Sequence, residues 1–257
     1  MFSSEPSFWR DRLTASGIHL GISLVVAALA ALLVFGIWYP YPYREISGGR
    51  ELFLLVITVD VILGPLITLA VFNRKKPRSE LRRDLAIVAL LQLGALGYGL
   101  WTVYVARPVH MVFEIDRFRV VHAIDVPEEL LAKTPSDIEA LPITGPTLLS
   151  VRPFKNSNEN MEATMAALQG ISLSSRPDLW QSYALARLDV LKVAKPVTTL
   201  QGRFPNRAND IERILSKAGR TAQNTVFVPM VGRKSFWTVF LDPQTAEIVA
   251  YMPLDSF

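Results

Sequence analysis

The chain has 257 residues and no cysteine, so disulfide frameworks and cysteine nucleophiles are excluded. The formal net charge of +4 is unevenly spread. The first 106 residues hold 10 Lys/Arg against 7 Asp/Glu, and the remainder holds 17 against 16. Most of the surplus positive charge therefore belongs to the N-terminal part, and it gives no indication of a nucleic-acid partner.

Three apolar runs occupy the first part of the chain, at residues 17–38, 52–72 and 84–106. At a rise of about 1.5 Å per residue, a helix of this length crosses a hydrocarbon core of about 30 Å. The first run is longer than the 7–15 or so residues of a signal-peptide core, and it ends at Trp38 rather than at small residues. We therefore predict a three-span transmembrane domain over residues 1–106.

The basic residues of the short loops predict the orientation of these spans. Residues 73–83 carry six Lys/Arg, whereas residues 39–51 carry only Arg44 and Arg50. The positive-inside rule places residues 73–83 in the cytoplasm together with the N-terminus. Residues 107–257, which follow the third span, are then expected outside the cytoplasm.

Residues 107–257 predict an α+β domain with a mostly antiparallel sheet, because strand patterns stand at both ends and helical patterns between them. Alternating apolar residues predict a strand pair or one bent strand at 110–126, and further strands near 148–151 and at 225–232, 235–242 and 246–253. Short helical turns are expected at 127–141, and helices at 157–170, 176–196 and 206–219. Asn206 is expected to cap the last helix and Gly219 to follow its end.

Catalytic motifs are missing from the sequence: it has no Gly-x-Ser-x-Gly elbow, phosphate-binding loop or His-Glu-x-x-His. His19, His110 and His122 are too scattered to indicate a metal site, and strand packing explains the last two better. Glu114 and Asp116 stand beside an arginine, which favours a salt-bridged turn over acid–base chemistry. We therefore predict no catalytic residue, no metal ligand and no cofactor.

Asp60 is the unusual residue of the second apolar run, where it stands in the stretch VDVILGP. A charged side chain at the membrane centre is disfavoured by about 2.5–3.5 kcal/mol on insertion scales, so it is expected to face protein. By helix rise, Asp60 lies about 12 Å from the outer end of its span. This depth excludes His19 and Arg12 as partners and matches Tyr98, with Gln92 one turn deeper. A protonated Asp60 that donates a hydrogen bond is expected.

Pro65 follows Asp60 closely and is expected to kink the helix, because proline cannot donate to the carbonyl of Val61. Small residues near it, and Ala95 with Gly99 on the third run, favour close helix contacts. Three interpretations stay open: packing within the bundle, a docking groove for another protein's transmembrane helix, and a proton or ion path, for which a single acid is poorly suited. The candidate docking residues are Asp60, Gly64, Pro65, Thr68, Gln92 and Tyr98.

Several stretches of the first 120 residues resemble the type IV pilin accessory protein family. They are GIHLGIS (17–23), WYPYPY (38–43), VDVILGPLITL (59–69), DLAIVALLQLGALGYG (84–99) and YVARPVHMVF (104–113). The later part of the chain matches more loosely, at FLDPQTAEIVAYMPLD (240–255).

The resemblance implies an inner-membrane protein with a cytoplasmic N-terminus and a periplasmic C-terminal domain, residues 107–257. It implies a chaperone-like accessory protein that binds its cognate type IV pilin and promotes pilus assembly without chemistry of its own. The pilin's transmembrane helix is the expected contact, and a contact with the pilin's periplasmic head stays open. The alternative is a membrane-bound enzyme that modifies pilin on the periplasmic side.

Overall fold

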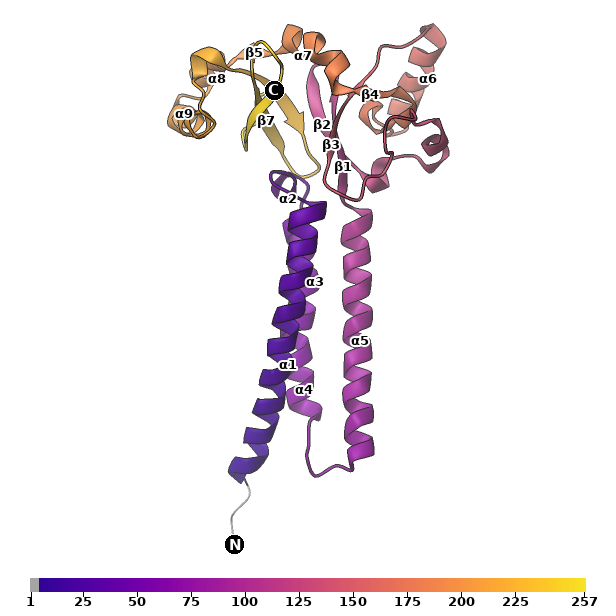
Figure 1. Cartoon of the computed structure of the whole chain (residues 1–257), viewed down its shortest axis with the longest axis vertical. Coiled ribbons are helices and arrows are strands. Elements are labelled where there is room, and N and C mark those ends of the chain that lie inside the picture. The colour runs from indigo at the N-terminus through magenta and orange to yellow at the C-terminus, as the bar shows by residue number, and fades with distance from the viewer. Residues whose placement is uncertain (1–4) are drawn as a thin grey trace. The chain divides into compact units, whose positions relative to one another are not determined.

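The computed structural model describes residues 5–257, so the first four residues of the predicted cytoplasmic arm lie outside it. The chain forms two compact units. The helix unit contains the chain up to Ile37 and Gly49–Val105; the sheet unit contains Trp38–Gly48 and Ala106–Phe257 (Figure 1). The segment Trp38–Gly48, which the sequence assigns to the first domain, thus groups with the sheet.

The helix unit confirms the three predicted long apolar helices. The first is α1 (Glu5–Leu33), which continues as the π-helical turn η1 (Val34–Trp38). The second comprises α3 (Gly49–Thr58), the π-helical turn η2 (Val59–Leu63) and α4 (Gly64–Val71). The third is α5 (Arg78–Val105). Within the described residues, these three helices are long and apolar enough to cross a membrane.

The second long helix is interrupted beside Asp60, where the sequence predicts a kink. The interruption is the π-helical turn η2, which ends one residue before Gly64 and two before Pro65. A proline lacks the N–H that would bond the carbonyl four residues earlier, and a π-turn shifts the hydrogen bonds by one residue. Asp60 therefore lies in a widened turn of the helix.

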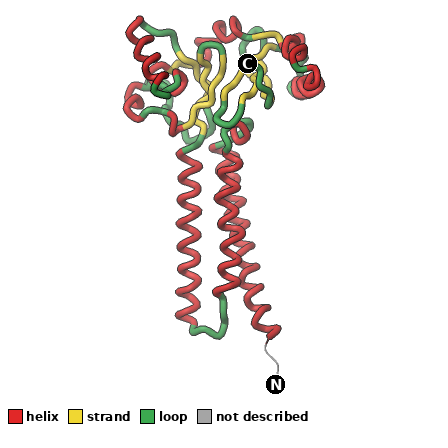
Figure 2. Tube along the Cα trace, turned by 180° about the vertical axis from the view of Figure 1, so that it is seen from behind, coloured by secondary structure: helices red, strands yellow, loops and turns green. Residues whose placement is uncertain are grey.

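The strands of the described residues form one eight-stranded sheet, yellow in Figure 2. In the order β4-β3-β1-β2-β6-β7-β8, the sheet is antiparallel except for the pairs β1–β3 and β2–β6, and β5 pairs with β6. The predicted mostly antiparallel sheet is thus confirmed. The strands are β1 (Pro108–Glu114), β2 (Arg117–His122), β3 (Thr147–Val151), β4 (Trp180–Ser182), β5 (Lys195–Pro196), β6 (Val226–Val231), β7 (Phe236–Leu241) and β8 (Ile248–Met252).

Helices connect the strands and cover the sheet. The α-helices of this unit are α2 (Tyr43–Ile46), α6 (Ser157–Leu168), α7 (Arg187–Val193), α8 (Val197–Arg203) and α9 (Ala208–Lys217). Short 3₁₀ turns are η3 (Ala123–Asp125), η4 (Glu128–Lys133), η5 (Leu173–Ser175), η6 (Pro177–Leu179), η7 (Tyr183–Ala186), η8 (Pro205–Arg207) and η9 (Ala222–Asn224).

The predicted helix at 176–196 is wrong, because this stretch contains two 3₁₀ turns, strand β4 and the shorter helix α7. Trp180 explains the break: its buried ring donates from Nε1 to the carbonyl of Ser174 at 2.7 Å, while its backbone pairs with β3. Gly219 follows α9 with a φ of +68°, as predicted for a C-terminal cap. Asn206 does not cap α9, since it lies inside η8 and Arg207 occupies the cap position.

The segment between the first two long helices contributes to the core of the sheet unit. Ile46 is fully buried in the cluster that contains Met111, Phe118 and Trp237. The backbone N–H of Lys234 donates to the Ile46 carbonyl at 3.1 Å. A Cβ on Gly232 would overlap the Ile46 side chain, so only glycine leaves room for it there. The opposite face of the sheet is filled by two further clusters, around α8–α9 and around Trp180.

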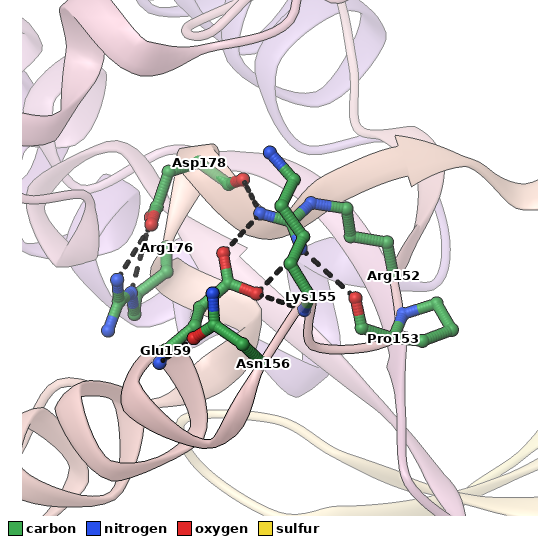
Figure 3. A network of polar contacts seen from close by, with 7 residues as sticks. All are labelled: Arg152, Pro153, Lys155, Asn156, Glu159, Arg176 and Asp178. Atoms are coloured by element: carbon green, nitrogen blue, oxygen red, sulfur yellow. Dashed lines mark hydrogen bonds and ion pairs between the residues drawn. The ribbon is translucent and has the colours of Figure 1, made fainter.

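A polar network anchors α6 to the sheet (Figure 3). Asn156 caps the helix by accepting from the N–H of Glu159 at 2.9 Å. Glu159 accepts two bonds from the Arg152 guanidinium, at 2.9 and 2.6 Å, and one from the N–H of Lys155 at 2.6 Å. The bonds from Arg152 and then from Lys155 lower the pKa of Glu159 to about 2. Arg152 also donates to the carbonyl of Asp178 at 3.0 Å, which links the network to η6.

Candidate functional site

The helix unit contains a groove with the second long helix as its floor. That helix packs against α1 through η2 and α4 and against α5 along its length. Two cavities, of about 450 and 180 Å³, lie between these helices and share His19, Ile22 and Ala89 in their walls. We call the combined feature the α1–α5 groove. Its walls are Thr14, Ile18, His19, Ile22, Ser23 and Val26 on one side and Leu85, Val88, Ala89, Gln92, Leu93 and Leu96 on the other.

Asp60 lies in the floor of the α1–α5 groove, within the smaller cavity. It is 6% exposed, and its Oδ1 atom is buried without a hydrogen-bond partner among the described residues. A buried polar atom without a partner destabilises a fold, and more so in an apolar surrounding. The groove therefore contains an unused hydrogen-bonding group within a mostly aliphatic surface.

Gly64 and Gln92 bring α4 and α5 together next to Asp60. The Gln92 Nε2 donates to the backbone carbonyl of Asp60 at 3.3 Å. A Cβ on Gly64 would overlap the Gln92 amide, so the absence of a side chain at Gly64 admits this contact. Gln92 thus approaches the Asp60 backbone and does not satisfy its carboxyl group.

Pro65 and Thr68 hold α1 against α4. The carbonyl of Pro65 accepts a hydrogen bond from Ser16 Oγ at 2.9 Å, and Thr68 Oγ1 lies 2.5 Å from His19 Nδ1. His19 thus pairs with Thr68, and Asp60 Oδ1 has no partner among the described residues, in line with the depth argument, although both side chains line the smaller cavity.

Tyr98 lies apart from this cluster. Its side chain is 71% exposed, and its ring centroid lies 6.0 Å from that of Trp101 on the same helix. The expectation that Tyr98 is the partner of Asp60 is therefore wrong. The sequence argument missed Ser16 and Ser23 and set His19 aside, although the spacing of these three residues places them on one face of a helix.

The histidines and acids of the first two strands have structural partners. His110 is buried, with Nδ1 at 2.7 Å from Thr147 Oγ1, Nε2 at 2.9 Å from the Ala140 carbonyl, and its ring against Trp180. Burial lowers the pKa of His110 to about 4, so the ring is neutral at pH 7. Asp116 forms a salt bridge with Arg117 at the β1–β2 turn.

Side chains that could bind a metal ion are not clustered in the part of the chain that the structure describes. No group of three or more His, Asp or Glu side chains is placed there to hold a metal ion. The α1–α5 groove has aliphatic walls and small residues that allow close approach, with polar groups at Asp60, His19 and Ser23. These are features of surfaces on which an apolar helix packs.

Comparisons with known proteins agree with one another. Residues 7–48 match the model of a family described as fimbrial assembly protein FimB. The chain is 36% identical over 244 residues to a fimbrial assembly protein of serogroup I from Dichelobacter nodosus, covering 94% of this chain and 95% of that protein. A serogroup E1 protein of the same organism is 35% identical with the same coverage, and one of serogroups C1 and C2 is 44% identical over 111 residues, 43% of this chain and 85% of that protein. No solved structure matches the chain.

Proposed function

The chain belongs to the fimbrial assembly protein family, and from this premise we propose that it is a chaperone-like membrane protein that binds its cognate type IV pilin. In this role it receives the transmembrane helix of the pilin in the α1–α5 groove and promotes fimbrial assembly. The observation that carries the proposal is Asp60, whose Oδ1 lies buried in that groove with no hydrogen-bond partner among the residues that the structure describes. A pilin helix with a hydrogen-bond donor at the matching depth supplies the missing partner.

The dimensions of the groove suit a single helix. Its α1 wall runs from Thr14 to Val26, which spans about 18 Å by helix rise. Both walls are mostly aliphatic, and close approach is possible at Ala89. In a bilayer, helices associate through packing and interhelical hydrogen bonds, because lipid is as apolar as the helices. The groove combines both contributions.

We place the protein in the inner membrane, with its N-terminus in the cytoplasm and the sheet unit in the periplasm. Asp11 forms an ion pair at 3.3 Å with Arg74 of the basic loop, which supports a common side for the start of α1 and residues 73–83. Packing of Trp38–Gly48 within the sheet unit supports the opposite side for that segment and for residues 107–257. A reporter fused after Phe257 is expected to be active only outside the cytoplasm; cytoplasmic activity contradicts this topology.

Replacement of Asp60 tests the groove. The chain is purified from detergent-solubilised membranes, and the amount of co-purified pilin is measured for the wild type, Asp60→Leu and Asp60→Asn. Asp60→Leu is expected to lower the pilin yield by about 5- to 30-fold, which corresponds to one interhelical hydrogen bond of about 1–2 kcal/mol. Asp60→Asn keeps an acceptor oxygen and is expected to retain most of the binding.

Gly97→Leu is the matched control for an added or enlarged side chain, because no atom lies within 4 Å of a Cβ built at this α5 position. It is expected to bind pilin as the wild type does. An Asp60→Leu protein that inserts normally, retains all co-purified pilin and supports full fimbriation would sink the proposal.

We propose that the role is non-enzymatic. The intact mass of pilin from cells with and without the chain is expected to be equal. A mass that depends on the chain would instead support the alternative, a membrane-bound pilin-modifying enzyme.

A further inference from the structure

A polar cavity of about 410 Å³ lies in the sheet unit, where β2 and β6 separate. These two strands are parallel and pair only at Phe118–Met230 and Arg119–Val231. Beyond those pairs β2 continues beside β1, while the chain after β6 turns into β7. The carboxyl ends of both strands therefore border one gap. The polar side chains in its wall are Arg119, His122, Asp125, Ser172, Ser175 and Arg233.

Two arginines in this wall are held in place by acids. Arg119 donates from Nε to Glu114 at 2.7 Å, and Arg233 donates from Nη2 to Asp125 at 2.6 Å. Each of these bonds uses one of the five N–H groups of its guanidinium. Each arginine is thus oriented by its acid and retains donors for a ligand. Guanidinium groups of this kind bind carboxylates through paired hydrogen bonds.

The two acids accept hydrogen bonds on both of their carboxylate oxygens. Asp125 accepts through Oδ2 from the backbone N–H of His122 at 3.2 Å and from its Nδ1 at 3.1 Å, while its Oδ1 holds Arg233. Burial alone would raise the pKa of Asp125, but His122 and Arg233 outweigh burial and lower it. Glu114 accepts through Oε2 from the N–H of Ser174 at 3.0 Å. Hydrogen-bond donors therefore remain in excess in the cavity.

His122 adds one unsatisfied acceptor to the same wall. Its side chain is 1% exposed, and Nε2 is buried without a hydrogen-bond partner among the described residues. Burial lowers the pKa of His122 against the opposing hydrogen bond to Asp125, so the ring is neutral at pH 7. Because Nδ1 donates to Asp125, the proton is on Nδ1 and Nε2 is an acceptor. A ligand that fits must bring an N–H or O–H donor as well as a negative charge.

We propose that this cavity binds a carboxylate carried by an extended peptide segment, with Arg119 and Arg233 on the carboxylate and a neighbouring peptide N–H on His122 Nε2. An acetate brings the charge but no donor, whereas hydrogen phosphate brings both and is separated from the peptide carboxylate by the titration below. The exposed apolar side chains of Met161, Met165 and Leu168 on α6 precede Gly170, Ile171 and Ser172 of the cavity wall in the sequence. The site does not depend on the α1–α5 groove.

Amino-acid derivatives with blocked amino and carboxyl groups serve as ligands to test the proposal. They are added to the full-length chain in detergent at pH 7 and constant ionic strength. N-acetyl-aspartate N-methylamide is titrated while the thermal unfolding of the sheet unit is followed by near-UV circular dichroism. A saturable rise in Tm is expected. The matching asparagine compound, acetate and inorganic phosphate are titrated in parallel. The asparagine compound is expected to bind about tenfold more weakly, because it lacks the charge.

Three variants in the cavity wall and one control variant locate the effect. Arg119→Gln and Arg233→Gln are each expected to remove the Tm response, whereas Arg213→Gln, at an exposed arginine of α9 that pairs with Asp210, is expected to keep it. His122→Phe is expected to reduce the affinity for the aspartate compound to that for acetate.

A missing response, an equal response to the asparagine compound, or a response that survives Arg119→Gln would overturn the site. Tighter binding of phosphate would overturn the peptide assignment. None of these measurements involves pilin, so their failure leaves the groove experiment untouched.

Discussion

The two units of the chain place their apolar side chains in opposite ways. In the helix unit, Leu32, Leu90 and Leu91 are 70%, 73% and 67% exposed, while Asp60 and Thr68 are buried. In the sheet unit, large aromatic side chains such as Phe118 and Phe240 are fully buried. The first pattern is typical of helices in a hydrocarbon environment, and the second is typical of a domain in water. In the helix unit the informative residues are therefore the few polar ones inside.

The same comparison shows why the loop between the first two long helices matters. Trp38–Gly48 follows an apolar helix in the sequence, yet its Tyr43 and Ile46 are buried in the core of the sheet unit. The sheet unit is thus completed by a segment that lies more than 50 residues before its main part. A fragment that begins at residue 107 would lack Tyr43 and Ile46 and therefore part of the core of the sheet unit.

Among the variants considered, Ile46→Ala is expected to change the stability of the sheet unit most. Because Ile46 is fully buried, its truncation is expected to lower the free energy of unfolding of the sheet unit by about 2–5 kcal/mol. Urea unfolding of the full chain in detergent measures this, followed by the near-UV circular dichroism of the buried Trp180 and Trp237.

Leu55→Ala is the control within the helix unit. Leu55 is 68% exposed, so the sheet transition is expected to move by less than about 0.5 kcal/mol. Equal effects of Ile46→Ala and Leu55→Ala would show that the segment is not part of the sheet core.

The sequence predicted most elements of both units, and its failures have physical causes. Long apolar runs and alternating strands such as β6 and β7 carry a strong local signal, and they are where predicted. The stretch at 176–196 has a helical apolar stripe, but pairing with β3 and the burial of Trp180 decide its structure. Local periodicity cannot register a partner strand that lies 30 residues earlier.

The candidate site was predicted in part for a similar reason. Asp60, Gly64 and Gln92 could be chosen because an acid, a glycine and an amide stand out in apolar runs, and the structure brings them together. Tyr98 was chosen by depth alone, and depth does not define which side of a helix a residue faces. His19 was excluded by depth, although its rotation on α1 places it in the groove.

Gly99→Leu tests whether a change in the helix unit affects the stability of the sheet unit. A Cβ at Gly99 would lie 2.6 Å from both Cγ atoms of Val56, so a leucine forces α3 and α5 apart. Overpacking of this kind is expected to cost about 1–3 kcal/mol. Thermal unfolding in detergent, followed at 222 nm for the helices and in the near-UV for the sheet unit, measures both units at once.

Gly97→Leu serves as the partner variant, because a Cβ there meets open space. The expected result is a helix transition that moves for Gly99→Leu and stays for Gly97→Leu. A near-UV transition that moves by the same amount as the helix transition would contradict the view that the α3–α5 contact stabilises the helix unit alone.

The smallest expected effect concerns charge at the surface of the sheet unit and is seen as a dependence on pH. Arg152 and the Lys155 N–H hold the pKa of Glu159 at about 2, below its ordinary value of 4.5. A carboxylate with a lowered folded-state pKa stabilises the fold above its ordinary pKa, and the contribution is lost as the pH falls from 4.5 through 2. Glu159→Gln, which cannot ionise, is expected to lower Tm at pH 7 and to approach the wild type near pH 2.

Glu162→Gln, on an exposed side chain of the same helix, provides the control. If the Tm difference between wild type and Glu159→Gln stayed constant over this range, the ionised Arg152–Glu159 pair would have no part in anchoring α6, and the Asn156 cap would have to hold that helix by itself.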